Sequence, residues 1–198
     1  MKKIVGLGGI CGAVAPVITY ACILLAIGSY REFNWINNAL SDLGVVSGIT
    51  MTVFNAGLIV GGILFTIFAL GLTQFLGKKL LGRAGSWILV IACVSLICIG
   101  IFNEHVKPIH YIVSVSLFFF MPIALWILTG AFWANGQKTM SIFTLAIGIA
   151  AATPWILEFT IHYAANVAIP EFISGLATSI WALVLSVKML REPEHSTS

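Results

Sequence analysis

Three histidines and two carboxylates are the side chains of this sequence best suited to chemistry. Imidazole nitrogens and carboxylate oxygens around one open position are typical ligands of catalytic zinc. A cation held there lowers the pKa of its bound water, so that hydroxide becomes available near neutral pH. The predicted metal ligands are His105, His110 and His162, and Asp42 or Glu158 would hold the metal or activate water.

The spacing of these residues is compatible with a metal site but does not define one. His105 and His110 are five residues apart across a turn that contains Pro108, and no HExxH pattern occurs. Glu158 and His162 are four residues apart, so they would share one face of a helix. Glu158 would lie near the carbonyl end of that helix, where the dipole disfavours a negative charge, and it therefore needs a partner.

Further polar residues are expected at the same level and would orient the head group of a substrate. These residues are Asn38 and Ser41, before the second apolar stretch, and Asn55, about one turn into it. His110 and Ser114 would share a helix face in the same way. Burying such groups without partners costs several kcal/mol, so we expect them to turn toward one another and line a polar cavity.

Several of these residues also have a purely structural interpretation. Asp42 could form an Asx-type turn that leads into the next helix, and Asn38 and Ser41 could cap a short helix. His105 could be an ordinary hydrogen-bonding residue at a helix mouth. Glu171 could interact favourably with the positive end of a helix dipole. The residue types alone leave both interpretations open.

The composition decides the class of protein that must position these residues. Of the 198 residues, 60% are hydrophobic and only 9% are charged, against roughly 25% charged in a soluble domain. The net charge of +3 is too small to indicate nucleic acid as a partner. The four cysteines lie in apolar stretches without metal-knuckle spacing. This is the composition of an integral membrane protein.

Six apolar stretches are long enough to cross a bilayer, which takes about 20 residues. They are 4–28, 51–75, 85–102, 109–133, 142–159 and 169–187. The sequence therefore predicts an all-α integral membrane protein, a six-helix transmembrane bundle forming one domain over residues 1–191. A long loop is expected at 29–50, with a short interfacial helix near 35–40, and a polar tail at 192–198.

The basic residues predict the orientation of the bundle. With both termini cytoplasmic, eight of the ten lysines and arginines lie inside, as the positive-inside rule requires. Only Arg31 and Lys107 then lie outside. The long loop and most of the candidate site residues are therefore expected on the extracytoplasmic side of the cell membrane.

Small residues recur at four-residue spacing in two of the predicted spans. The pairs are Gly8 with Gly12 and Gly57 with Gly61. Such spacing lets two helix backbones approach closely, either within one chain or between two copies. The oligomeric state is left open by the sequence.

The loop string NALSDLG at 38–44, with His105 and His110 flanking the entry to the fourth span, resembles a known family. It is the prokaryotic domain-of-unknown-function family nine-nine-eight, and the resemblance runs from the first span to the sixth. It implies a six-helix membrane fold and no particular activity. The string is more distantly similar to a motif of the Frag1/DRAM/Sfk1 family, six-helix proteins linked to membrane lipid organisation.

Three functions are consistent with these observations. The first is a metal-dependent hydrolase, with zinc as the expected cofactor, that acts on a membrane lipid or amphiphile. The second is a non-enzymatic lipid-binding or scaffold protein in which the same residues form a hydrogen-bonded plug. The third is a small transporter, which is disfavoured because few ionisable groups are expected near the midplane.

Overall fold

Six helices of 22 to 28 residues form the protein, as the six apolar stretches predict. The computed structural model describes residues 2–77 and 79–191, and it contains no strand within them. Lys78 and the predicted polar tail at 192–198 lie outside the described residues. The helices are α1 (Lys2–Ser29), α2 (Ile49–Phe75), α3 (Leu80–Ile101), α4 (Lys107–Ala134), α5 (Lys138–Ile161) and α6 (Ala168–Arg191).

Each helix is long enough to cross a membrane and satisfies its backbone polar groups internally, which lipid requires of any spanning segment. The largest difference from the predicted bounds is α3, which begins at Leu80 rather than at residue 85. Its first turns contain the exposed Arg83, whose long side chain can reach water while the helix continues.

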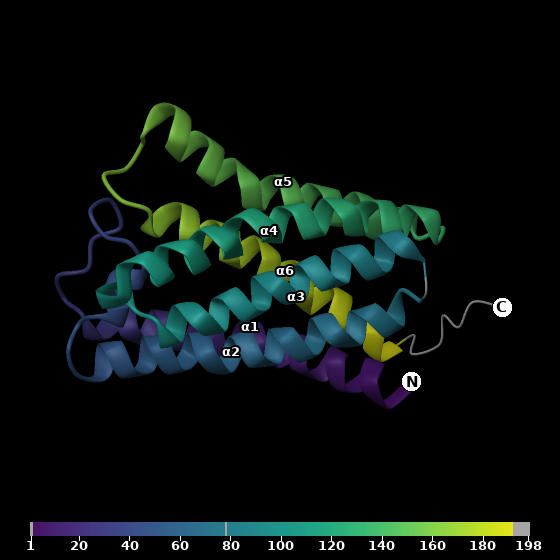
Figure 1. Cartoon of the computed structure of the whole chain (residues 1–198), viewed down its shortest axis with the longest axis horizontal. Helices are drawn as coiled ribbons and strands as arrows, with labels where there is room; N and C mark the ends of the chain where they lie inside the picture. Colours follow the sequence, from purple (N-terminus) through teal and green to yellow (C-terminus); the bar gives the residue numbers. More distant parts are fainter. Residues whose placement is uncertain (1, 78, 192–198) are drawn as a thin grey trace.

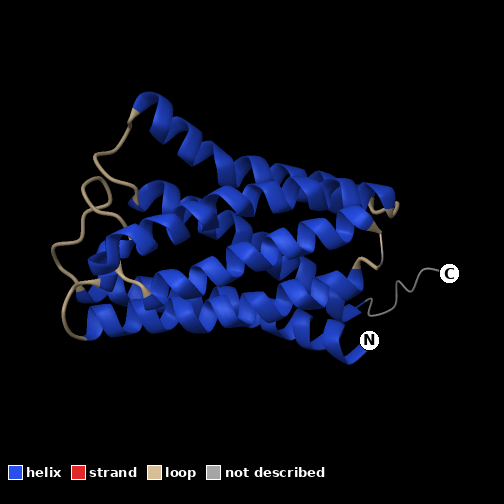
Figure 2. Ribbon diagram, viewed as in Figure 1, coloured by secondary structure: helices blue, strands red, loops and turns tan. Residues whose placement is uncertain are grey.

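Neighbouring helices run antiparallel, and α6 packs against both α1 and α5 (Figures 1 and 2). We call one end of the bundle the loop end, because it carries the connections 30–48, 102–106 and 162–167. The first and last described residues lie at the opposite end (Figure 1). Which end faces the cytoplasm stays a prediction from the basic residues.

Two separate apolar clusters fill the bundle. The cluster at the loop end contains Leu43 and Phe54. The cluster in the opposite half contains Phe68, Leu128 and Trp181. Residues of both clusters, among them Phe54 and Phe68, line a cavity inside the bundle.

The glycines of α2 let it pack closely against α1 within the same chain. A Cβ atom at Gly57 would collide with the side chain of Cys22, and one at Gly61 with Thr19. Gly8 on α1 likewise meets the backbone of Gly71 on α2. The small residues therefore serve intramolecular packing, which was one of the two expectations.

The long loop differs from its prediction, because no helix forms at 35–40. The Asn34 side chain accepts hydrogen bonds from the backbone N–H groups of Ile36 and Asn37, at 2.9 and 3.1 Å, which closes a turn instead. Asparagine favours such turns because its short amide competes with the helical hydrogen bonds. A one-turn 3-10 helix, η1, follows at Ser41–Gly44.

Candidate functional site

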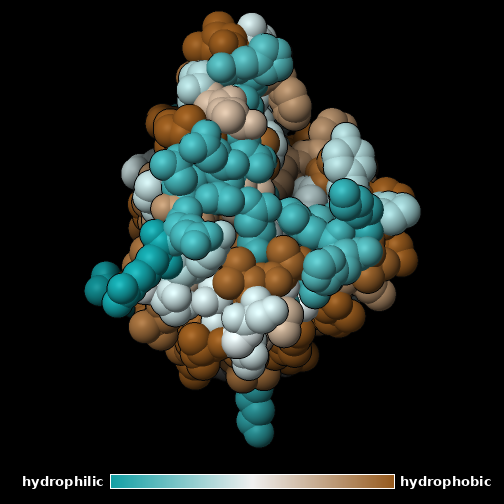
Figure 3. All heavy atoms as spheres, turned by 90° about the vertical axis from the view of Figure 1, so that its left-hand side faces the viewer, coloured by the Kyte–Doolittle hydropathy of each residue, from teal (hydrophilic) through white to brown (hydrophobic). Residues whose placement is uncertain are grey.

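A pocket of about 800 Å³ opens at the loop end between α4 and α5. Figure 1 shows α5 diverging from α4 toward this end. Figure 3 looks onto the loop end, where hydrophilic residues gather within a surround of hydrophobic ones. Three of the predicted site residues line this loop-end pocket: Ser41, Asp42 and His110.

The loop 38–44 folds over the helix mouths and is tied by its own polar side chains. Asp42 Oδ2 accepts from Asn38 Nδ2 at 2.7 Å and from the backbone N–H of Ala39 at 3.0 Å. Ser41 is buried and donates its hydroxyl to Glu104 Oε1 at 2.7 Å. Asp42 thus closes a turn by binding residues that precede it in the chain, and it also lines the pocket.

Glu171 joins the loop to α6, a role that sequence reasoning missed. It lies in the first turn of α6, yet its Oε2 accepts from the backbone N–H of Leu40, 131 residues away, at 2.6 Å. Glu104 and Asp42 lie close enough to repel its carboxylate electrostatically. Three acidic side chains therefore meet at the mouth of this pocket.

His110 is buried beneath the mouth, and one of its hydrogen bonds places a proton on Nδ1. Its Nδ1 lies 2.7 Å from the carbonyl oxygen of Phe102, which can only accept, so the proton sits on Nδ1. Nε2 then faces the Ser114 hydroxyl at 3.5 Å. The expected His110–Ser114 face is present, and it points into the pocket.

The other two histidines do not line the pocket. His105 is exposed on the 3-10 helix η2 (Glu104–Val106). His162 is the exposed residue that ends α5, with a left-handed φ of 48°. Within residues 2–77 and 79–191, no three His, Cys, Asp or Glu side chains are grouped so as to hold a metal ion. The zinc site stays a prediction.

Glu158 and His162 lie in different surroundings, although the sequence predicts that they share one helix face. His162 is the residue that ends α5: its N–H still donates to the carbonyl oxygen of Glu158 at 3.0 Å, but its φ is left-handed and it is exposed. Glu158 is 6% exposed, and its Oε2 has no hydrogen-bond partner among the described residues. Burial, together with repulsion from Glu158, raises the pKa of the neighbouring Tyr163.

Asn38 and Asn55 hold the loop rather than line the pocket. Asn38 binds Asp42, as described above, and accepts from the backbone N–H of Asn34 at 2.9 Å. Asn55 Nδ2 donates to the carbonyl oxygen of Gly44 at 3.0 Å. Their predicted contact with a substrate head group stays a prediction.

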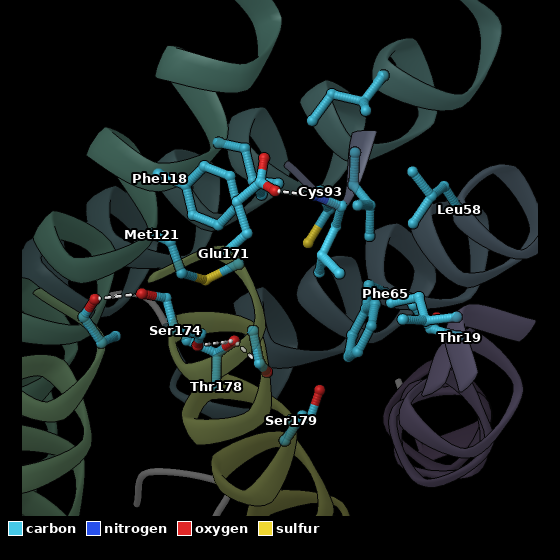
Figure 4. A pocket seen from close by; sticks show the side chains of 18 of the residues that line it. Thr19, Leu58, Phe65, Cys93, Phe118, Met121, Glu171, Ser174, Thr178 and Ser179 are labelled. Carbon is cyan, nitrogen blue, oxygen red and sulfur yellow. Dashed lines mark hydrogen bonds between the residues drawn. The ribbon is translucent and has the colours of Figure 1, made fainter. Parts of the chain in front are cut away.

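A second, interior cavity of about 110 Å³ lies between the two apolar clusters (Figure 4). All six helices line it, and most of the lining is apolar, including Leu58, Phe65 and Met121. Ser174, Thr178 and Ser179 add hydroxyls from α6. The Ser174 hydroxyl is engaged by the carbonyl oxygen of Ala151 at 2.7 Å.

The two cavities share part of their lining. The shared residues are Ser41, Ser114, Phe118 and Glu171. A polar mouth at the loop end is therefore adjacent to an apolar interior, with these four side chains at the junction.

Aromatic side chains form one wall of the loop-end pocket. The rings of Phe118 and Trp155 lie 4.6 Å apart between centroids, and those of Trp155 and Phe159 lie 6.0 Å apart. Tyr111 and Phe119 of α4 also line this pocket. The four-residue spacing of Trp155 and Phe159 predicts that they share one face of a helix. That this face lies opposite α4 depends on how the helices pack, which the spacing does not determine.

The fold and its two cavities define a multi-pass α-helical membrane protein with a pocket of charged and aromatic side chains at one end and an apolar cavity behind it. The chain belongs to DUF998, a family described as protein of unknown function, which matches residues 13–188. This confirms the resemblance noted from the loop string. No curated protein and no solved structure matches the chain. Similarity to the Frag1/DRAM/Sfk1 family stays a prediction.

Proposed function

We propose that this protein binds one membrane lipid or amphiphile without transforming it. The head group lies in the loop-end pocket, and a hydrocarbon chain reaches the interior cavity. The single observation that carries this proposal is the junction at which Ser41, Ser114, Phe118 and Glu171 line both spaces. We place the loop end on the outer side of the cell membrane, as the basic residues predict.

The size and lining of the interior cavity support a hydrocarbon occupant. Its volume is about 110 Å³. An apolar cavity of roughly 150 Å³ in another protein stays dry and binds benzene. A space of this kind accommodates the end of a chain rather than a head group, and a polar ligand buried there would lose its hydration.

A buried tryptophan makes the proposal testable. Trp181 is 2% exposed and lines the interior cavity, so bromine atoms in the surrounding bilayer do not contact it. The other five tryptophans are first replaced by phenylalanine, because several of them are exposed and bilayer bromine would quench them directly. In nanodiscs of lipids brominated along their acyl chains, we expect the emission of the remaining Trp181 to be quenched relative to ordinary lipid. Trp181 emission that is equal in brominated and ordinary lipid would show that no chain enters the cavity.

A matched pair of variants on α4 tests the path into the cavity. Ser114→Phe places a ring at the junction, whereas Ser116→Phe adds the same ring at a position that lines neither cavity. Overpacking of this size costs 1–3 kcal/mol, which corresponds to about tenfold weaker chain entry or more. We expect Ser114→Phe to lose the Trp181 quenching and Ser116→Phe to retain it. Size-exclusion chromatography controls for folding.

A metal-dependent hydrolase is the second candidate, favoured because His110, Ser41 and Asp42 surround one pocket. In this proposal His105 and His162, which do not line the pocket in this structure, would move to hold zinc together with His110, and Asp42 or Glu158 would activate water. Protein purified without chelators would then contain near-stoichiometric zinc by elemental analysis, and His162→Ala would lose it. Negligible metal in the unmodified protein would eliminate this candidate and leave lipid binding unaffected.

A further inference from the structure

We infer that the loop-end pocket selects an amphiphile whose head group carries a positive ammonium. This inference rests on the proposed lipid binding and adds the chemistry of the head group. Three carboxylates, Asp42, Glu104 and Glu171, line the pocket, together with one ammonium group, that of Lys107. Acidic side chains therefore outnumber ammonium groups at the mouth.

The carboxylates retain acceptor capacity after their bonds to the protein are counted. Asp42 uses Oδ2 and Glu104 uses Oε1 for the bonds that fix the loop. These bonds do not use Asp42 Oδ1 or Glu104 Oε2. A cation in the pocket would face these oxygens and offset the mutual repulsion of the three acids.

The aromatic wall is a second and independent observation. Tyr111, Phe118, Trp155 and Phe159 line the same pocket as the acids. Ring faces attract cations within about 6 Å, and several rings together are the usual recognition element for quaternary ammonium groups. Acids alone would accept any cation, including a metal ion. Acids beside aromatic rings favour an organic ammonium.

The position of the charge fits an amphiphile better than a free cation. Val115, Phe118 and Phe119 extend the pocket along α4 toward the apolar part of the bundle. An ammonium held at Asp42 and Glu104 would leave its chain beside Phe118, at the entrance to the interior cavity. The head group would therefore contact charged and aromatic side chains, and the hydrocarbon chain would contact apolar ones.

Three probes with the same twelve-carbon chain test this inference: dodecyltrimethylammonium, dodecanol and dodecanoate. Binding is measured by equilibrium dialysis against the protein in nanodiscs of an uncharged galactolipid, with empty nanodiscs subtracted. We expect dodecyltrimethylammonium to bind about tenfold more tightly than dodecanol, and dodecanoate to bind most weakly. Equal affinity for dodecyltrimethylammonium and dodecanol would overturn the head-group inference and leave lipid binding intact.

Variants show whether the preference for ammonium comes from the pocket or from the overall charge of the protein surface. Glu104→Gln keeps an acceptor for Ser41 and removes the charge, and we expect most of the preference for ammonium to disappear. Glu32→Gln removes an exposed acid of the same loop that does not line the pocket, and it should change nothing. Trp155→Leu should weaken dodecyltrimethylammonium binding and leave dodecanol binding unchanged.

The remaining outcomes are also decisive. An equal effect of Glu104→Gln and Glu32→Gln would assign the preference to surface charge and overturn the inference. Tighter binding of dodecanoate would make Lys107 the dominant group and overturn it as well. If none of the three probes binds above empty nanodiscs, the proposed function fails together with the inference.

Discussion

Replacing Gly61 with leucine should prevent α1 and α2 from packing and lower the free energy of unfolding by more than about 3 kcal/mol, the upper end of overpacking effects. A Cβ atom at this position already collides with the Thr19 hydroxyl, and it would lie 3.1 Å from the Thr19 Cβ, which a change of rotamer does not move. Thermal unfolding of the purified protein in detergent, followed by circular dichroism, measures the loss.

Gly6→Leu is the matched control for this experiment. Gly6 lies on α1, and a Cβ atom there meets nothing within 4 Å. We expect its unfolding to differ little from that of the unmodified protein. If Gly61→Leu changed the oligomeric state while leaving the stability of the monomer unchanged, the small residues would serve contacts between copies, and the intramolecular interpretation would be wrong.

Replacing Glu171 with alanine should release the loop 34–44 from the mouth of the bundle. Its carboxyl group is the acceptor for the N–H of the buried Leu40 at 2.6 Å, and leaving a buried donor without a partner costs about 1–3 kcal/mol. We expect amide hydrogen exchange across this loop to become about 10 to 100 times faster. Exchange in the middle of α6 should not change.

Two further variants show whether the effect comes from this bond. Glu171→Gln keeps an oxygen acceptor and should restore most of the protection. Glu32→Ala removes an exposed acid of the same loop and should leave exchange as it was. Unchanged exchange in Glu171→Ala would mean that the other bonds of the loop hold it without Glu171, among them those from the Asn166 and Ala168 N–H groups to the carbonyl oxygens of Ile36 and Asn38.

Local properties of the sequence determined the helices of this protein. Six runs of apolar residues were enough to predict α1 to α6, because lipid permits only helices or closed barrels and no alternating pattern occurs. The pairing of His110 with Ser114 was equally predictable, since residues four apart on a helix share a face. Both inferences depend on distances along the chain that are set by helix geometry.

The same reasoning failed where a helix ends. It treated His162 as an interior residue of α5, whereas His162 adopts a left-handed conformation at the end of the helix. It also expected a helix at 35–40, where the Asn34 side chain closes a turn. Helix ends are decided by a single side chain or dihedral angle, and hydropathy does not detect either.

Only the tertiary structure decided what forms the candidate site. Glu171 was interpreted from its own helix, but its partner Leu40 is 131 residues away in the sequence. Trp155 meets Phe118 because α5 and α4 lie side by side and then diverge toward the loop end. The cavities are the space left between helices, and their size depends on how the side chains of all six pack together. Composition and periodicity describe one helix at a time and therefore cannot predict that space.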